Sequence, residues 1–338
     1  MSILSGRPRR CALAVAAFAV VLAISGIAAV HMATGTAAAH PGSAAVGVVT
    51  AMVGAVAPAA AGATTAAAQP ISPTTPSQQM QNAILAAEPG SRVGIDVVDT
   101  TSGTTLAELN TDQQFYTASV VKLLIALDEL KSVNWQPDSD TAALLSQMLS
   151  ASDDDIADAL WDTGGGPDIV SRVAADIGLG ATEPPDDPAQ WGETLTTPAD
   201  VVRIYRYIGS EIPQPARDLI LTALHRASAT AADGTDQYFG IPDALIGTDW
   251  AIKQGWMTLD DSTTLNTTGL VSADPAQPGR FVVVVLTAQP AGTAWTTGGA
   301  AVTAAVAALR EILAPTTAVA AASTETVTCS SICPASAR

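Results

Sequence analysis

The sequence has few of the side chains on which several classes of enzyme depend. Its 338 residues include three histidines and three cysteines, and His31 and His40 fall in an alanine-rich amino-terminal tract. A zinc or iron site in the body of the chain would therefore lack its usual ligands, and we expect no metal and no other cofactor. A Ser-His-Asp triad would depend on His225, and the helical pattern around His225 favours a structural role for it.

Basic residues are also scarce. Lys and Arg total 15 against 32 Asp and Glu, which gives a net charge of −17. Such a surface repels polyphosphates, so the composition argues against a nucleic-acid partner. Lysine itself occurs at positions 122, 131 and 253 only. Any lysine chemistry in this protein must therefore use one of these three positions.

Charged side chains are absent between residues 11 and 87. Arg7, Arg9 and Arg10 precede this stretch, and the residues from Cys11 to Val30 are apolar. A positive segment followed by an apolar run of roughly membrane-spanning length is typical of a signal peptide or a membrane anchor. We therefore expect residues 1–31 to direct export, with membrane contact confined to this segment. The sequence leaves open whether the segment is cleaved.

The remainder of the chain divides by composition into three parts. Residues 32–76 are rich in Ala, Thr and Pro and predict a linker. Residues 77–314 predict a folded domain, which we expect to be monomeric. Residues 315–338 predict a disordered tail, in which Cys329 and Cys333 either pair or are incidental thiols.

Hydrophobic periodicity within the domain predicts strands at both ends and helices between them. The expected strands cover 93–98, 105–108, 250–253, 264–271 and 281–286. The expected helices cover 78–87, 119–131, 140–149, 155–162, 167–177, 198–209, 214–226 and 299–313, with a long loop at 179–197. This order predicts an α+β fold, in which an antiparallel sheet of about five strands carries helices.

Ser119 and Lys122 lie three residues apart at the start of the helix expected at 119–131. Residues with this spacing share a helix face, so the amine can reach the hydroxyl. The helix is apolar nearly all round, which indicates a buried element. A lysine buried in such a helix loses solvation, which favours its neutral form and allows it to act as a base. The alternative is that Lys122 only extends its amine to the surface.

Two further segments complete a motif set. Ser152-Asp153-Asp154 follows the helix expected at 140–149, and Lys253-Gln254-Gly255 lies on a strand. With Ser119 and Lys122, these segments resemble the S-x-x-K, S-D-N and K-T-G motifs of class A β-lactamases and penicillin-binding proteins. The stretches 191–197 and 253–256 also resemble the W-G-x-T-x-T-T and K-x-G-W patterns of exported actinobacterial serine hydrolases. The resemblance implies a β-lactamase/transpeptidase-like fold over about residues 80–313, with helices on both faces of the sheet and a helical subdomain.

The same resemblance implies a role for each residue. Ser119 would be the acylated nucleophile and Lys122 its base, and Ser152 would pass a proton to the leaving nitrogen. Lys253 would hold that hydroxyl and attract a substrate carboxylate. Backbone N–H groups of Ser119 and Trp256 would bind the oxyanion, and Asp154, Gln254, Gly255 and Trp256 would contact substrate. The substrate would be a small molecule or a peptidoglycan peptide.

Two positions depart from the family pattern, and a third lies in a loop that is shorter than the family norm. Asp154 replaces an Asn, so it is either protonated, or it holds Lys122, or it is only part of an acidic helix start. Gln254 replaces a Thr or Ser that would contact a carboxylate, and Arg280 is the nearest following arginine. Glu183 matches the Glu that activates the deacylating water in class A enzymes, although its loop is short. Glu183 is either that base or a plain loop carboxylate.

Two main classes of function remain open on the sequence, beside a purely structural envelope protein, for which only the linker and the tail would argue. The first is an exported serine hydrolase, and the departures favour a slow, D,D-peptidase-like enzyme over an efficient β-lactamase. The second is a non-catalytic cell-envelope protein that uses the same fold for binding. Loss of the motif Asn and Thr favours the second, whereas retention of both Ser–Lys pairs favours the first.

Overall fold

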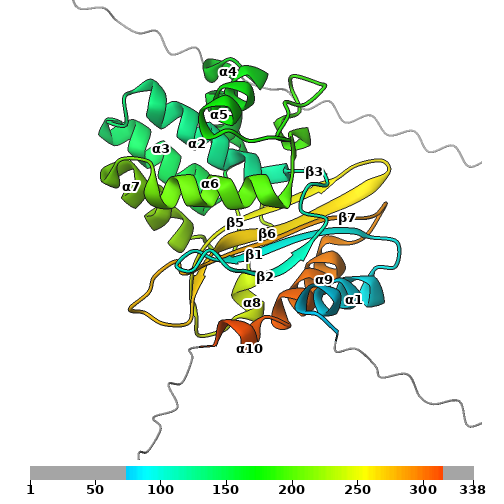
Figure 1. Cartoon of the computed structure of the whole chain (residues 1–338). Helices are drawn as coiled ribbons and strands as arrows, with labels where there is room; N and C mark the ends of the chain where they lie inside the picture. The colour runs from blue at the N-terminus through cyan, green and yellow to red at the C-terminus, as the bar shows by residue number, and fades with distance from the viewer. Residues whose placement is uncertain (1–73, 315–338) are drawn as a thin grey trace, which may run out of the picture. The chain divides into compact units, whose positions relative to one another are not determined.

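Five strands form one antiparallel sheet in the part of the chain that the computed structural model describes, residues 74–314 (Figure 1). Their order across the sheet is β2-β1-β7-β6-β5, so β5 forms one edge and the strands from the two ends of the domain meet at β1 and β7. The strands are β1 (Arg92–Asp99), β2 (Thr105–Leu109), β5 (Asp249–Thr258), β6 (Ser262–Ser272) and β7 (Phe281–Pro290). The predicted α+β fold and its five-stranded antiparallel sheet are confirmed.

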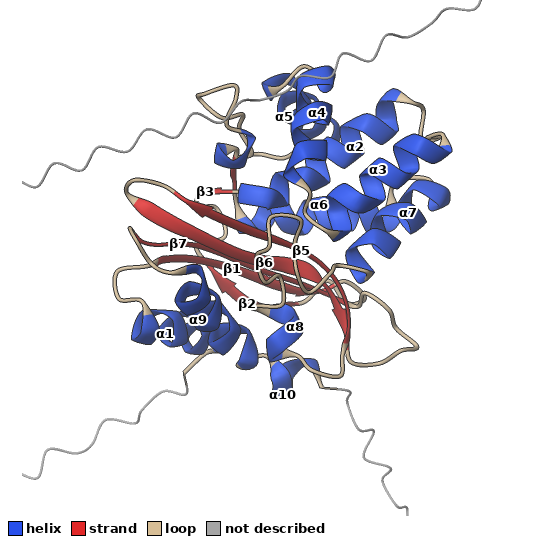
Figure 2. Cartoon of the chain, turned by 180° about the vertical axis from the view of Figure 1, so that it is seen from behind, coloured by secondary structure: helices blue, strands red, loops and turns tan. Residues whose placement is uncertain are grey.

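Helices cover both faces of the sheet (Figure 2). One layer consists of α1 (Pro76–Ala87), α8 (Ile241–Ala244), α9 (Trp295–Ala307) and α10 (Arg310–Leu313). The other consists of α2 (Lys122–Ser132), α3 (Ser139–Ser150), α4 (Asp154–Gly164), α5 (Pro167–Ile177), α6 (Pro198–Ser210) and α7 (Gln214–His225). The second layer is the predicted helical subdomain.

The apolar strand β7 explains how two layers are held by one sheet. Successive side chains of a strand point to opposite faces. Val282, Val284 and Leu286 accordingly belong to the core beneath the helical subdomain, and Phe281, Val283 and Val285 belong to the core beneath α1 and α9. All six are buried, which accounts for the continuous apolar run in the sequence.

Local signals set several helix ends where they were expected. The Thr197 side chain accepts a hydrogen bond from the Asp200 N–H, and Pro198 occupies the first turn of α6. The helix predicted at 299–313 differs, because it begins at Trp295 and is split into α9 and α10. The predicted loop 179–197 contains a short 3-10 turn, η2 (Trp191–Glu193), and the strand β4 (Leu195–Thr196). Strand β4 pairs with β3 (Phe115–Tyr116), a tertiary contact that no local pattern encodes.

Some predictions concern residues that the structure does not describe. The signal or anchor segment 1–31, the linker up to residue 73 and the tail 315–338 with Cys329 and Cys333 lie outside the described residues. Within residues 74–314, no helix is both long enough and apolar enough to cross a membrane.

Candidate active site

Ser119 lies in a tight turn that leads into the central helix of the subdomain. The residues Ala118–Val121 form a 3-10 turn, η1, and Lys122 begins α2 directly after it. The Lys122 amine donates a hydrogen bond of 2.8 Å to the Ser119 hydroxyl, as the three-residue spacing predicts. Ala118 has a φ of 45°, a conformation that costs a non-glycine residue on the order of 1–3 kcal/mol.

Lys122 is fully buried, in agreement with the apolar pattern of α2. Burial lowers the pKa of its amine below the usual range, because the charged form loses its solvation. The Asp154 carboxylate opposes this shift, since it accepts a 2.6 Å hydrogen bond from the same amine and favours the charged form. Lys122 therefore lies between a helix core that favours a neutral base and an acid that holds it in place.

A second Ser–Lys pair lies beside the first. Lys253 on β5 donates a 2.9 Å hydrogen bond to the Ser152 hydroxyl, and both residues are buried. Burial and repulsion by Lys122 set the pKa of Lys253 well below its usual range. Ser152 has a φ of 52°, so this site contains a second strained non-glycine residue. The two pairs are linked electrostatically, because the charge of the Lys122 amine lowers the pKa of Lys253.

Asp153 and Asp154 begin α4 immediately after Ser152. The Asp153 carboxylate caps the helix by accepting from the Ile156 N–H, which agrees with the acidic helix start. Asp154 contacts Lys122, and its side chain is 51% exposed. Of the roles that the sequence leaves open for Asp154, the structure shows the contact with Lys122 and a place in the acidic first turn of α4, which Asp153 caps.

Strand β5 approaches the nucleophile turn at Gly255. A Cβ at this position would lie 2.6 Å from the Thr117 carbonyl oxygen, so only glycine fits without a shift of the backbone. Asn266 on β6 fixes the same turn, because its amide donates to the carbonyls of Tyr116 and Thr117 at 2.9 and 3.2 Å. Asn266 could not be predicted from the sequence, since nothing local marks a buried amide in the middle of a strand.

Gln254 does not reach this site with its side chain. Its neighbour Lys253 faces Ser152, so the alternation of the strand directs Gln254 to the other side. There its buried amide donates to the carbonyls of Phe239 and Gln237 at 2.5 and 3.2 Å. The structure thus places Gln254 in contact with the 237–239 backbone, away from the side chains of Ser119 and Lys122.

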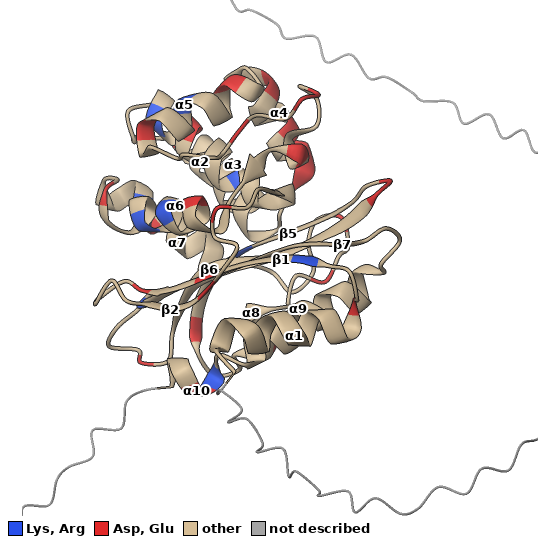
Figure 3. Cartoon of the chain, turned by 45° about the vertical axis from the view of Figure 1, so that its right-hand side comes forward, with Lys and Arg blue, Asp and Glu red and all other residues tan. Residues whose placement is uncertain are grey.

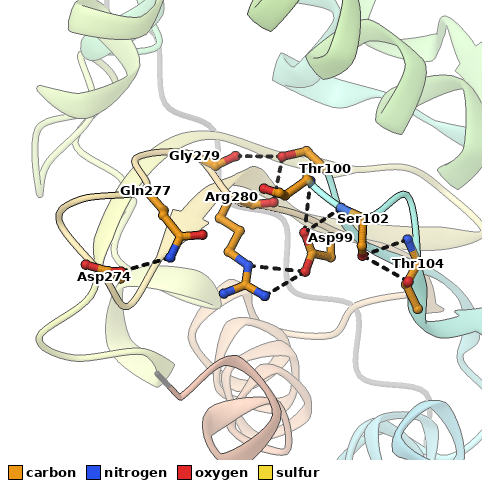
Figure 4. Close-up of polar contacts among 9 residues, drawn as sticks. Asp99, Thr100, Ser102, Thr104, Asp274, Gln277, Gly279 and Arg280 are labelled. Carbon is orange, nitrogen blue, oxygen red and sulfur yellow. Dashed lines mark hydrogen bonds and ion pairs between the residues drawn. The ribbon is translucent and has the colours of Figure 1, made fainter. Parts of the chain in front are cut away.

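Arg280 is likewise held elsewhere. Its guanidinium donates two hydrogen bonds, of 2.8 and 3.1 Å, to one carboxylate oxygen of Asp99 (Figure 4). The Arg280 guanidinium also holds the pKa of Asp99 below its usual range. Arg280 is therefore engaged where β1 and β7 pair, and no substrate contact follows from its position.

Glu183 and Trp191 lie in the loop 179–197, and Asp200 lies directly after it on α6. Glu183 is exposed and pairs with Leu195 through its backbone, and its carboxylate forms no hydrogen bond or ion pair within residues 74–314. Trp191 instead reaches the reacting pair, with its ring centroid 4.2 Å from the Lys122 amine. Asp200 fixes the neck of the loop by accepting from Gly180, Ala181 and Thr182. The Trp-Gly of the 191–197 motif was the available signal for Trp191, whereas Asp200 carried none.

Trp256, the last residue of the K-x-G-W pattern, also contacts an acid. Its indole N–H donates to Asp233 at 3.0 Å, and its ring lies 5.9 Å from the Lys253 amine.

Acidic residues are prominent on α4 and on the loop beside it (Figure 3). Within residues 74–314, no group of three or more His, Cys, Asp or Glu side chains is arranged to hold a metal ion.

Comparisons with known proteins agree with this geometry. Residues 75–135 match the model of a family described as the "Beta-lactamase enzyme family". The chain is 34% identical over 218 residues to the "Putative lipoprotein LppW" of Mycobacterium tuberculosis (strain ATCC 25618 / H37Rv), and the match covers 62% of this chain and 67% of that protein.

Solved structures share the fold. A class A β-lactamase from Mycobacterium abscessus matches with a TM-score of 0.58 and 21% identity, over 70% of this chain and 99% of that one. The structure of PBP-A matches with a TM-score of 0.55 and 19% identity, over 69% and 95% respectively. On the family match, the relative and the fold together, the chain belongs to the family of β-lactamase-like and penicillin-binding-protein-like serine hydrolases.

Proposed function

We propose that the protein is an exported active-site serine hydrolase in which Ser119 is acylated by an amide or β-lactam carbonyl. The observation that carries the proposal is the pair of buried Ser–Lys contacts, 2.8 Å at Ser119–Lys122 and 2.9 Å at Ser152–Lys253. Burial of four polar side chains is costly unless they are paired, and here two are amines whose pKa values are lowered. Such perturbed groups favour a reaction site over a structural core.

The chemistry follows from the contacts. Neutral Lys122 takes the hydroxyl proton of Ser119 as its oxygen bonds to the carbonyl carbon of the substrate. The oxygen of that carbonyl becomes negative, and backbone N–H groups of Ser119 and Trp256 are the proposed donors to it. The carbon–nitrogen bond then breaks, Ser152 gives its proton to the leaving nitrogen, and the proton that Lys122 took from Ser119 returns to Ser152, whose hydroxyl Lys253 holds in place. Water later releases the acyl group from Ser119.

The final step is the one for which this site is least equipped. Glu183, the candidate base for the deacylating water, is exposed, and its carboxylate has no hydrogen-bond or ion-pair partner within residues 74–314. We therefore propose slow deacylation, as in a D,D-peptidase-like or penicillin-binding protein, in preference to efficient β-lactam turnover. A non-catalytic cell-envelope binding protein is the second candidate, and the replacement of the motif Asn by Asp154 favours it.

The proposed location is outside the cytoplasmic membrane. The relative from Mycobacterium tuberculosis carries the name of a lipoprotein, and Arg7, Arg9 and Arg10 precede an apolar run in this chain. The proposed substrate is accordingly a peptidoglycan peptide or another small molecule of the envelope, and no nucleic acid is involved. We propose that the protein acts as a monomer.

Two measurements on the full-length chain distinguish these functions. Nitrocefin hydrolysis measures turnover, and fluorescence in a denaturing gel after fluorescent penicillin measures accumulation of an acyl-enzyme. A persistent adduct with little turnover is the expected result. Rapid nitrocefin hydrolysis would replace the slow enzyme by a β-lactamase, and folded protein without adduct or turnover would favour the binding protein.

A further inference from the structure

Strand β5 forms the edge of the sheet beside the turn that carries Ser119. An edge strand presents unpaired backbone groups, and extended peptides commonly bind by adding to it. Lys253, Gly255 and Met257 share one face of β5. Lys253 contacts Ser152, and Gly255 lies against the turn that carries Ser119.

Met257, the third residue of this face, contacts the 179–197 loop. A Cβ on Gly192 would lie 3.1 Å from the Met257 sulfur and 3.7 Å from the Ala118 Cα. Gly192 therefore lies between β5 and the nucleophile turn. Two hydrogen bonds keep it there, because Thr117 donates its N–H to the Thr194 carbonyl at 2.8 Å and its hydroxyl to the Gly192 carbonyl at 3.4 Å.

Trp191, the residue before Gly192, lies over the reacting pair Ser119 and Lys122. Its ring lies against the Lys122 amine, and its indole N–H donates a 2.7 Å hydrogen bond to Asp158 on α4. Ser119 is only 4% exposed under this cover. Two cavities of about 560 and 790 Å³ border α6, and neither is lined by Ser119, Lys122, Ser152 or Lys253. The open space of these cavities is thus separate from the reacting groups.

We propose that Trp191 is a specificity-determining residue that closes the Ser119 site and is latched by Asp158. A carbonyl compound reaches Ser119 only if it is narrow enough to pass Trp191 or if it displaces the ring from Asp158. Bulky bicyclic substrates consequently acylate Ser119 slowly. The proposal rests on the proposed function only in taking Ser119 as the reacting group.

The test measures access separately from catalysis. Full-length Ser119→Cys is alkylated with iodoacetamide as a small reagent and with a fluorescent maleimide as a bulky one, and the modified peptide is quantified by mass. The comparison is Ser119→Cys with Trp191→Ala. We expect the ratio of the bulky to the small rate to rise at least tenfold. The ratio cancels changes in thiol ionisation, which alter both rates.

Matched variants control for folding and for charge. Trp295→Ala removes another indole, whose N–H donates to Thr258 at 2.9 Å, and should leave the ratio unchanged. Asp158→Ala should raise the ratio, whereas Asp158→Asn keeps an oxygen acceptor and should raise it less. A melting curve records that each variant is folded. An unchanged ratio in folded Trp191→Ala would overturn the proposal.

The penicillin reaction provides the second arm. Trp191→Ala with Ser119 intact should be labelled at least fivefold faster by fluorescent penicillin than the unaltered chain. If no variant is labelled while the alkylation ratio still rises, the closure stands and the proposed hydrolase function fails. If labelling slows in Trp191→Ala, Trp191 assists the reaction and the closure is wrong.

Discussion

Gly255 lies so close to Thr117 that a Cβ at position 255 would stand 2.6 Å from the Thr117 carbonyl oxygen and 3.3 Å from the Ser119 amide nitrogen. This contact sets the distance between β5 and the nucleophile turn. It therefore also sets the spacing of the two N–H groups proposed to bind the oxyanion. A glycine in the third motif is required here by space, independently of any contact with substrate.

Gly255→Ala should therefore destabilise the protein and slow acylation together. Overpacking of this kind costs roughly 1–3 kcal/mol, because the backbone has to move. The melting temperature should fall by several degrees, and the rate of labelling by fluorescent penicillin should fall more than tenfold. Gly209→Ala is the matched control, since nothing lies within 4 Å of a Cβ there and a helical alanine is favoured. A variant at Gly255 that melts and reacts normally would contradict the close contact.

Asp154 should control the pH at which acylation begins. Only neutral Lys122 accepts the Ser119 proton, so the rate rises with pH through the pKa of Lys122. The Asp154 carboxylate raises that pKa by favouring the charged amine. Asp154→Asn should then move the acidic limb of the acylation profile to lower pH. Asp155→Asn, at the neighbouring exposed position on α4, should leave the limb in place. A shift of the Asp154→Asn limb to higher pH would contradict the assigned role.

Lys253 should reduce the free energy of unfolding, although the proposed reaction requires it. Its folded pKa lies well below the value of a free lysine, so the unfolded chain holds one more proton between the two values. The free energy of unfolding therefore rises as the pH rises from the folded to the unfolded pKa of Lys253. At pH values below the folded pKa, the lysine reduces the free energy of unfolding by the full amount. Lys253→Met should unfold at pH 7 with an unchanged free energy or one up to about 2 kcal/mol higher, and with a weaker pH slope.

Urea unfolding of Lys253→Met at pH 7, 8.5 and 10 checks this expectation. Lys131→Met is the control, because Lys131 is half-exposed and pairs with Asp176 at the surface. Acylation of Lys253→Met should be lost even where its stability is retained. A marked loss of stability at pH 7 would show that Lys253 holds the fold and that its burial is not a cost.

Asp96 on β1 offers an independent check of the electrostatics. Burial, together with Glu108 on β2 and Asp112, raises its pKa to about 6, and Arg206 on α6 opposes the shift. The folded state therefore holds an extra proton between about pH 4 and pH 6, and stability falls as the pH rises through this range. Asp96→Asn should be more stable by about 2 kcal/mol at pH 8 and equal to the unaltered chain near pH 4.

The measurement is urea unfolding at pH 4, 6 and 8. Asp260→Asn changes an exposed carboxylate in the middle of the β5–β6 turn and should alter stability little at any of these values. An Asp96→Asn variant whose advantage does not grow with pH would exclude a charged, buried Asp96 at neutral pH.

The elements and contacts that local sequence patterns encode could be predicted from the sequence. The i, i+3 spacing placed Ser119 and Lys122 in contact, and Thr197-Pro198 marked the start of α6. The contact between Ser152 and Lys253 spans 101 positions, so only the resemblance to a known motif set anticipated it. The alternating apolar residues of β7 are buried on both faces, as an uninterrupted apolar strand indicates.

The remainder depended on tertiary contacts. The side of β5 that Gln254 faces is decided by the docking of Lys253 against Ser152, which no local pattern reports. The Trp191 position depends on the path of a loop whose neck is fixed by Asp200, a residue that reads in the sequence as an ordinary helix-start acid. Close approaches such as Gly192 to Met257 follow from three-dimensional packing alone.

The site of acylation tests the proposed role of Ser119 most directly. The full-length chain and its Ser119→Ala variant are incubated with fluorescent penicillin, and the intact mass and the labelled peptide are recorded over minutes to hours. We expect one adduct per chain, located on Ser119, that persists for hours and is missing from the variant. An adduct on another residue, or equal labelling of both proteins, would contradict this role.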